Sequence, residues 1–251
     1  MSASKGGNDA ATARRTPARD AKVDAADAGA RSRRRGHACA WALAWALGAL
    51  PAAAADGIVL RDVTRDTGIG FRHTDGSSGR RYIVETVSAG LALFDYDSDG
   101  DVDIYFVNGA PLPGTQTKER PRDALYRNDG GWKFTDVTDV AGVGDTGYGL
   151  GVVAGDHDGD GDLDLYVSNF GPNVLYRNNG DGTFTDVTRS AGVAVGDHVG
   201  AGANFLDADG DGDLDLFVAS YLRFSFDAHV GTTTNGVPVY ANPRFYRVGV
   251  E

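Results

Sequence analysis

The chain has 251 residues, of which 41% are hydrophobic and 24% charged, with 36 Gly, 8 Pro and a formal net charge of −11. This composition excludes a chain that is disordered throughout, and the surplus of glycine predicts many tight turns. Residues 56–251 carry 15 Lys or Arg against 31 Asp or Glu. We therefore expect no binding to nucleic acid, for which a basic surface is the usual electrostatic requirement.

The first 55 residues differ in composition from the rest. Residues 1–30 are rich in Ala, Ser, Gly, Asp and Arg without apolar periodicity, which predicts a disordered extension. Residues 31–55 combine the basic stretch Arg31–Arg35, an apolar run from residue 38 to residue 50, and the small residues Ala53–Ala55. This order is typical of a secretory signal peptide, and the apolar run is short for a membrane span. We expect cleavage after residue 55 and export to the periplasm, cell surface or medium, with no membrane span left; an uncleaved N-terminal anchor is the alternative.

The single cysteine, Cys39, lies at the start of the signal peptide's apolar run, so we expect no lipid attachment there. The arginines before Gly36 and His37 match a twin-arginine signal poorly, which leaves the export route open. Residues 56–251 contain no cysteine. Bound metal would then supply the cross-links that many secreted domains take from disulfides.

The segment 57–64 is the first predicted element of the exported part. Its residues Leu60–Thr64 repeat the Asp-Val-Thr of Phe184–Thr188 farther along the chain. We predict a strand there, equivalent to the last strand of a repeat and able to clasp a closed ring.

An acidic motif, Asp-x-Asp-x-Asp-Gly-x-x-Asp, occurs three times between short apolar runs, each time with a further Asp at its seventh position. The copies are Asp95, Asp97, Asp99, Asp101 and Asp103; Asp156, Asp158, Asp160, Asp162 and Asp164; and Asp207, Asp209, Asp211, Asp213 and Asp215. Neighbouring carboxylates repel one another by roughly 3 kcal/mol per pair at about 5 Å and an effective dielectric constant near 20. A bound cation removes this repulsion.

Hard oxygen ligands around a glycine-tightened turn suit Ca²⁺ better than softer transition metals. A single copy could be a solvated Asp-Gly turn, but three copies in the same register predict about three Ca²⁺ sites. EF-hand loops need a Glu at position twelve and flanking helices, whereas the twelfth positions here are Phe106, Val167 and Val218, in runs typical of strands. We expect side-chain ligands from positions one, three, five and nine and a backbone carbonyl from position seven.

A second hairpin follows each of the first two acidic loops. The segments Tyr126–Thr138 and Tyr176–Thr188 both begin Tyr-Arg-Asn, pass through a turn that contains Gly, and end Phe-Thr-Asp-Val-Thr. Two hairpins and four strands within about 50 to 60 residues match the size of a β-propeller blade. We predict an all-β fold, a partial β-propeller with about three four-stranded blades. The predicted blades are 89–138, 149–188 and 200–251.

These repeats resemble the FG-GAP or VCBS repeats of integrin α-subunit propellers. Ala89–Tyr105 is similar to the first blade of the group that contains cartilage acidic protein and the ASPIC/UnbV proteins, and Leu175–Asp186 is similar to the recurring Leu-Tyr-Arg-Asn hairpin of that group. The resemblance covers about residues 57–221. It implies a calcium-binding extracytoplasmic propeller, seven-bladed when complete, that serves adhesion or acts as a scaffold. It implies no particular ligand.

About three blades do not close a ring, since propellers typically have four to eight. Residues 221–251 contain only Phe245-Tyr246-Arg247 as a partial copy of Tyr-Arg-Asn. We therefore expect residues 56–251 to be a piece of a longer propeller. Expressed alone they should be oligomeric or poorly soluble, because an open stack exposes strand edges and apolar faces.

Catalytic motifs are weak in this sequence. His73 and His198 are isolated, and no Ser or Cys nucleophile lies in a recognisable motif, so we expect both histidines to be structural or surface residues. We expect His157, inside the second acidic loop, to face solvent. Glu85 fits either a pocket near the propeller axis or a solvated loop, as do Arg80 and Arg81. Trp132 is expected to pack between blades rather than to bind a sugar.

Two classes of function fit these observations. A non-enzymatic, calcium-stabilised adhesion or scaffold module accounts for every repeated feature, with a protein or glycan partner that the sequence does not identify. The alternative is an exported propeller enzyme acting on carbohydrate, of lyase or dehydratase type, since a fold does not determine function. A second metal site of His and Glu in the central channel would favour the enzyme.

Overall fold

The computed structural model describes residues 60–117, 120–194, 196 and 198–242. The predicted extension at 1–30, the predicted signal peptide at 31–55 and Cys39 lie outside these residues. None of the helices in the described part of the chain has the length and apolarity that a membrane span requires.

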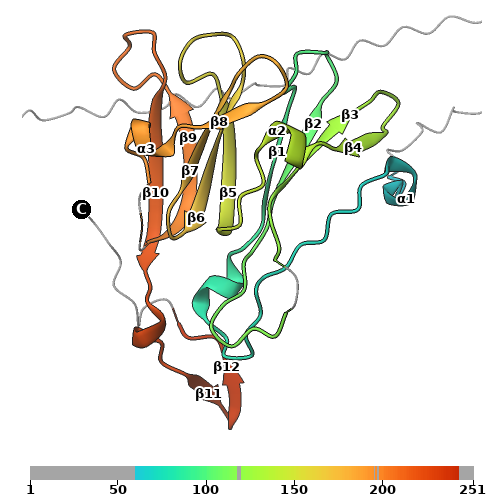
Figure 1. Cartoon of the computed structure of the whole chain (residues 1–251). Coiled ribbons are helices and arrows are strands. Elements are labelled where there is room, and N and C mark those ends of the chain that lie inside the picture. Colours follow the sequence, from blue (N-terminus) through green and yellow to red (C-terminus); the bar gives the residue numbers. More distant parts are fainter. Residues whose placement is uncertain (1–59, 118–119, 195, 197, 243–251) are drawn as a thin grey trace, which may run out of the picture. The chain divides into compact units, whose positions relative to one another are not determined.

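The fold of the described residues is nearly all-β, as predicted. Its strands form open, propeller-like antiparallel sheets (Figure 1). Two sheets have four strands, each strand hydrogen-bonded to the next in sequence order. The first contains β1 (Gly90–Phe94), β2 (Asp103–Val107), β3 (Ala124–Asn128) and β4 (Phe134–Asp136). The second contains β5 (Tyr148–Gly155), β6 (Asp164–Phe170), β7 (Val174–Asn178) and β8 (Phe184–Asp186).

The third unit is built differently from the first two. Its acidic-loop hairpin, β9 (His198–Leu206) and β10 (Asp215–Arg223), forms a two-stranded sheet. After the short 3₁₀ helix η2 (Phe226–Ala228), β11 (Thr232–Thr234) and β12 (Val237–Val239) pair only with each other. Within residues 198–242, the third unit therefore lacks the two outer strands that complete the first two sheets.

One helical turn follows the last strand of each four-stranded sheet. These turns, α2 (Thr138–Ala141) and α3 (Thr188–Ala191), end at Gly142 and Gly192, whose positive φ angles of 76° and 70° suit glycine. The same Val-Thr start produces α1 (Thr64–Thr67). The clasp strand expected at 57–64 is wrong in its described part. Residues 60–63 pair with no strand, and a strand needs a neighbour to take its hydrogen bonds. Thr64 begins a helix.

The main hydrophobic core lies between the two four-stranded sheets. It includes Tyr105 and Val107 of β2 and Leu165 and Val167 of β6, all at most 1% exposed. Gly149 of β5 allows close contact between the sheets, because a Cβ there would lie 2.0 Å from a methyl carbon of Val107. A second cluster surrounds Tyr82, which directly precedes the 3₁₀ segment η1 (Ile83–Thr86), and includes Phe224 after β10.

A buried acid just before β3 corresponds to a buried amide just before β7. Asp123 accepts the Asn108 N–H at 2.7 Å and contacts the Tyr105 hydroxyl at 3.1 Å. One repeat later, Asn173 accepts the Asn169 N–H at 2.8 Å and donates to the Tyr166 hydroxyl at 2.7 Å. Burial, and to a lesser degree the charge of Asp145, raises the pKa of Asp123 well above its usual range.

Asp123→Asn is expected to stabilise the protein at pH 7 by about 1 kcal/mol or more. Because the folded state raises this pKa, the wild-type carboxyl favours folding below about pH 4 and loses that contribution as the pH rises through the folded-state value. The gain from the amide should therefore be small at pH 4 and grow with pH, which urea unfolding at several pH values would measure. The matched exchange Asn173→Asp should do the opposite, and parallel pH profiles for the two variants and the wild type would refute the account.

Candidate metal centres

The three acidic loops connect the first two strands of each sheet, β1–β2, β5–β6 and β9–β10, and lie at the same end of the strands (Figure 1). In each loop the first aspartate accepts backbone N–H groups from the turn. Asp95 accepts from Asp99 at 3.1 Å and from Gly100 at 2.9 Å. Asp156 accepts from Gly161 at 3.0 Å and Asp207 accepts from Gly212 at 3.1 Å. The sixth-position glycines have φ angles of 93°, 97° and 98°, which explains why this position is Gly.

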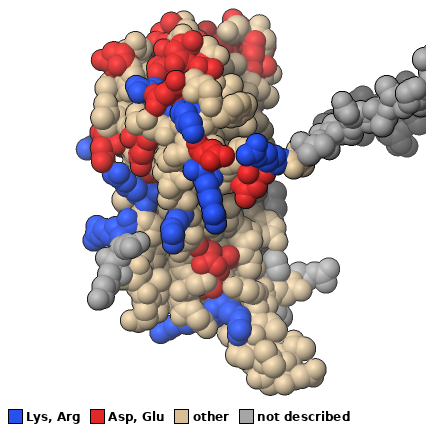
Figure 2. Space-filling view, turned by 90° about the vertical axis from the view of Figure 1, so that its right-hand side faces the viewer, with Lys and Arg blue, Asp and Glu red and all other residues tan. Residues whose placement is uncertain are grey.

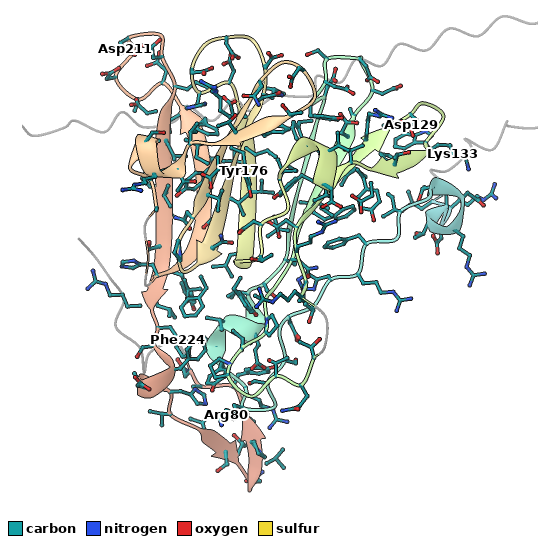
Figure 3. All side chains as sticks on the ribbon, in the orientation of Figure 1. Arg80, Asp129, Lys133, Tyr176, Asp211 and Phe224 are labelled. Atoms are coloured by element: carbon teal, nitrogen blue, oxygen red, sulfur yellow. The ribbon has the colours of Figure 1, made fainter. Side chains whose placement is uncertain are left out.

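Carboxylate oxygens converge in each loop. Oxygens from positions one, three and five lie within 4.8 Å of one another in the first two loops; these residues are Asp95, Asp97 and Asp99, and Asp156, Asp158 and Asp160. In the third loop the converging residues are Asp207, Asp209 and Asp215, from positions one, three and nine. Asp211 lies at the outer end of this loop (Figure 3).

Asp97 provides the clearest sign that a cation fits. Its Oδ1 atom is buried and has no hydrogen-bond partner, an arrangement that costs free energy unless something else satisfies the oxygen. Burial and the charges of Asp99 and Asp95 raise its pKa. A Ca²⁺ ion bound by these oxygens would satisfy the orphaned atom and remove the repulsion.

The ninth-position aspartates hold the loops to the sheets. Asp103 and Asp164 are fully buried. Asp103 accepts the Tyr96 N–H at 3.0 Å and the Asn128 N–H at 2.7 Å, and Asp164 repeats both bonds with His157 at 2.9 Å and Asn178 at 2.7 Å. Burial raises the pKa of Asp103 to about 6.

The seventh-position aspartates, Asp101, Asp162 and Asp213, belong to none of the carboxylate groups. Their backbone N–H groups donate to the fifth-position carboxylates at 2.9–3.0 Å. That their backbone carbonyls would be ligands of the ion stays a prediction. On the face drawn in Figure 2, acidic side chains gather at the end that carries the loops.

His157 does not face solvent, which corrects the prediction from the sequence. Its side chain is 22% exposed, and Nδ1 lies 2.5 Å from Asp164 Oδ2. With Asp158 and Asp164 it forms a further group of potential ligands. The hairpin register brings positions two and nine of the loop together, a contact that the spacing alone did not indicate.

Asn178 is a buried residue that links the first two acidic loops, a role that was not predicted from the sequence. Its side-chain amide donates to the Tyr96 carbonyl of the first acidic loop at 2.8 Å and to the Leu163 carbonyl of the second loop at 3.2 Å. The side chain is 1% exposed. The repeated Tyr-Arg-Asn motif was the available signal, since it occurs in both complete units.

Trp132 does not pack between sheets as predicted. It is 71% exposed, at the tip of the β3–β4 hairpin whose neighbouring residues Asp129 and Lys133 are labelled in Figure 3. Its φ angle is 61°, and the equivalent residue of the second sheet is Gly182, with φ 83°. The left-handed turn directs this side chain outward, away from the core.

The remaining sequence candidates do not form a catalytic group among the described residues. Glu85 is buried rather than in a solvated loop, and accepts from the Ser78 hydroxyl at 2.7 Å and the Tyr82 N–H at 3.3 Å. His198 accepts from Arg223 Nε at 2.9 Å. His73, His198 and Glu85 belong to none of the potential metal-binding groups found in the described part of the chain.

The FG-GAP-like repeat family matches the chain twice, at residues 95–167 and 156–218. Each match runs from the first position of one acidic loop to the twelfth position of the next. The chain therefore carries FG-GAP-like repeats, which are typical of adhesion- or scaffold-like modules, are often extracellular and are generally non-enzymatic.

No curated protein matches the chain. One solved structure that it resembles concerns the structural basis of specific recognition of non-reducing terminal N-acetylglucosamine by a lectin of Agrocybe aegerita. The sequence identity is 26% and the TM-score 0.32, over 53% of this chain and 33% of that chain. The match thus spans about a third of that protein's length.

Proposed function

We propose that this chain is an exported calcium-binding repeat protein that acts as an adhesion or scaffold module, related to the cartilage acidic protein and ASPIC/UnbV group. The observation that carries the calcium assignment is the carboxylate cluster of the first loop, with the orphaned Asp97 oxygen inside it. The equivalent positions of the second and third loops would hold two further ions.

The chemistry of the donors supports Ca²⁺ in particular. Each loop offers several carboxylate oxygens on a flexible turn, and Ca²⁺ accepts six to eight oxygens in irregular geometry, whereas Mg²⁺ demands a near-ideal octahedron. We propose ligands from positions one, three, five and nine, with the seventh-position backbone carbonyl. The bound ions would neutralise the acidic end of the sheets and keep each loop closed.

No observation favours the enzyme alternative. The potential metal-binding groups of the described residues all lie in the acidic loops, and none combines His with Glu. We therefore propose a non-catalytic role, in which the ions maintain a surface that a protein or glycan partner recognises.

A capture experiment tests this role. The full chain, immobilised in calcium, is expected to retain specific proteins or glycans from an exported fraction and to release them when a chelator is added. Asp158→Ala should retain less partner than Asp227→Ala, a control at an exposed aspartate outside the loops. Equal capture in calcium and in chelator would contradict a calcium-maintained binding surface.

Export is expected to remove residues 1–55, which leaves Asp56 as the new N-terminus. The physical reason is the order of basic stretch, apolar run and small residues, which a signal peptidase recognises. N-terminal sequencing of protein from the periplasm or medium measures the cleavage site. Recovery of the intact chain in the membrane fraction alone would support an uncleaved anchor instead.

A further inference from the structure

The three units pack against one another in the order in which they follow in the chain (Figure 1). The second strand of each unit carries an aromatic residue ten positions after the first aspartate of its acidic loop: Tyr105, Tyr166 and Phe217. Tyr105 is fully buried in the core between the first two sheets. Tyr166 is also fully buried, on the face of β6 opposite to Leu165 and Val167, which belong to that core. Tyr166 therefore points toward the third unit.

The same close contact joins both pairs of neighbouring units. A Cβ atom at Gly149 of β5 would lie 2.0 Å from Val107 of the first sheet, and one at Gly200 of β9 would lie 2.1 Å from the hydroxyl oxygen of Ser168 in the second sheet. Val107 and Ser168 each come two residues after the buried tyrosine of their strand. The two contacts are therefore equivalent, and the third unit packs on the second as the second packs on the first.

The two end faces of this stack expose side chains whose equivalents are covered at the inner contacts. On the third unit, Phe217 is 61% exposed, and Leu206 on the same face is 42% exposed. On the first sheet, Leu93 of β1 is 62% exposed, whereas its equivalent in β5, Ala154, packs against the core between the sheets. Leu91, on the same face as Leu93, is 52% exposed. Exposed apolar faces of this kind mark sites of association.

Hydrogen bonding distinguishes the end faces in the same way. In the second sheet, the Asn178 amide donates to its own acidic loop and to the carbonyl of Tyr96, at position two of the preceding loop. Its equivalent in the first sheet, Asn128, is buried, and among the described residues its amide donates only to Val102 of its own loop. Position two of the third loop is Ala208. Its carbonyl is the equivalent acceptor for the second N–H of Asn128 in another copy of the chain.

We infer that two copies of this chain associate head to tail, with the third unit of one copy packed on the first sheet of the next. Phe217 of one copy would then be buried against Leu91 and Leu93 of the other. This contact repeats between copies the packing that the units already make within the chain, which is why a second copy fits these faces. Because the two faces differ, the contact is heterologous: a dimer keeps one free face of each kind and can add further copies. The association expected from the sequence thus acquires a defined pair of faces.

Charged substitutions at the two faces test the inference by sedimentation velocity of the full chain in calcium. The wild type should form dimers and larger oligomers as its concentration rises. Leu93→Asp and Phe217→Asp each place a carboxylate on one face and should each weaken association about tenfold or more, because the contact would bury an unpaired charge. Val140→Asp is the matched control, since Val140 is an exposed residue of α2 that belongs to neither face. It should associate like the wild type.

A mixture of the two face variants distinguishes a head-to-tail contact from a symmetric one. Leu93→Asp keeps an intact face on its third unit and Phe217→Asp keeps one on its first sheet, so the mixture should form a 1:1 dimer that neither variant forms alone. Melting temperatures check that each variant is folded, which is expected because the substituted side chains are exposed.

Two results would overturn the inference. A wild type that stays monomeric at every concentration would indicate that other residues of the same chain, or a different protein, cover these faces. A symmetric contact through one face would leave one variant associating like the wild type and give no 1:1 dimer in the mixture.

Discussion

Removal of calcium by a chelator is expected to lower the melting temperature of the protein by about 5–10 °C for each site that was occupied. A ligand at 100 times its dissociation constant stabilises the folded state by about 2.7 kcal/mol per independent site, and 1 kcal/mol corresponds to about 2–4 °C in a domain of this size. The ion replaces the repulsion among the clustered carboxylates with attraction, so its loss leaves each loop under electrostatic strain. Differential scanning calorimetry with and without chelator measures the effect.

Asp158→Ala assigns the effect to a particular loop. Asp158 belongs to both groups of potential ligands in the second loop, so its loss should reduce the calcium stoichiometry in a titration from about three to about two. Asp227→Ala, outside the loops, should leave the stoichiometry unchanged. An identical melting temperature in calcium and in chelator, with no heat of calcium binding, would disprove the calcium assignment.

Asn178→Ala is expected to destabilise the protein by roughly 2–4 kcal/mol. Its buried side chain donates to the carbonyls of Tyr96 and Leu163 and accepts the Gly180 N–H at 3.1 Å. Truncation leaves two buried carbonyls without these donors, and each lost bond costs about 1 kcal/mol or more. Denaturant unfolding in chelator measures this loss apart from any effect on calcium.

Asn128→Ala is the matched control in the first sheet. Asn128 donates to the Val102 carbonyl at 3.2 Å and accepts the Gly130 N–H at 3.1 Å, both within its own repeat. It should therefore cost less than Asn178→Ala, which also breaks the bond to the first acidic loop. Equal losses from the two substitutions would show that the bond between the repeats contributes nothing measurable.

The acidic loops, their spacing and the hairpins that carry them could be predicted from the sequence because they depend on short-range interactions. The Asp-Gly turns need glycine at a positive φ angle, as Gly100 and Gly161 show, and the flanking β-branched and aromatic residues favour strands over helices. The repetition of Tyr-Arg-Asn and Asp-Val-Thr indicated four strands per unit. The structure confirms the resulting all-β, propeller-like sheets, whereas residues 60–63 of the predicted clasp strand pair with no strand and Thr64 begins a helix.

The sequence by itself determined the repeat and its hairpins and predicted which aspartates would bind a cation, since a hairpin brings together residues that are close in the chain. Only the tertiary structure decided which polar groups are buried and which segments meet. The contact of His157 with Asp164, the bond from Asn178 to Tyr96 and the exposure of Trp132 follow from sheet register and packing. No local pattern encodes such contacts between segments distant in sequence, because their free energy is gained only when the whole unit folds.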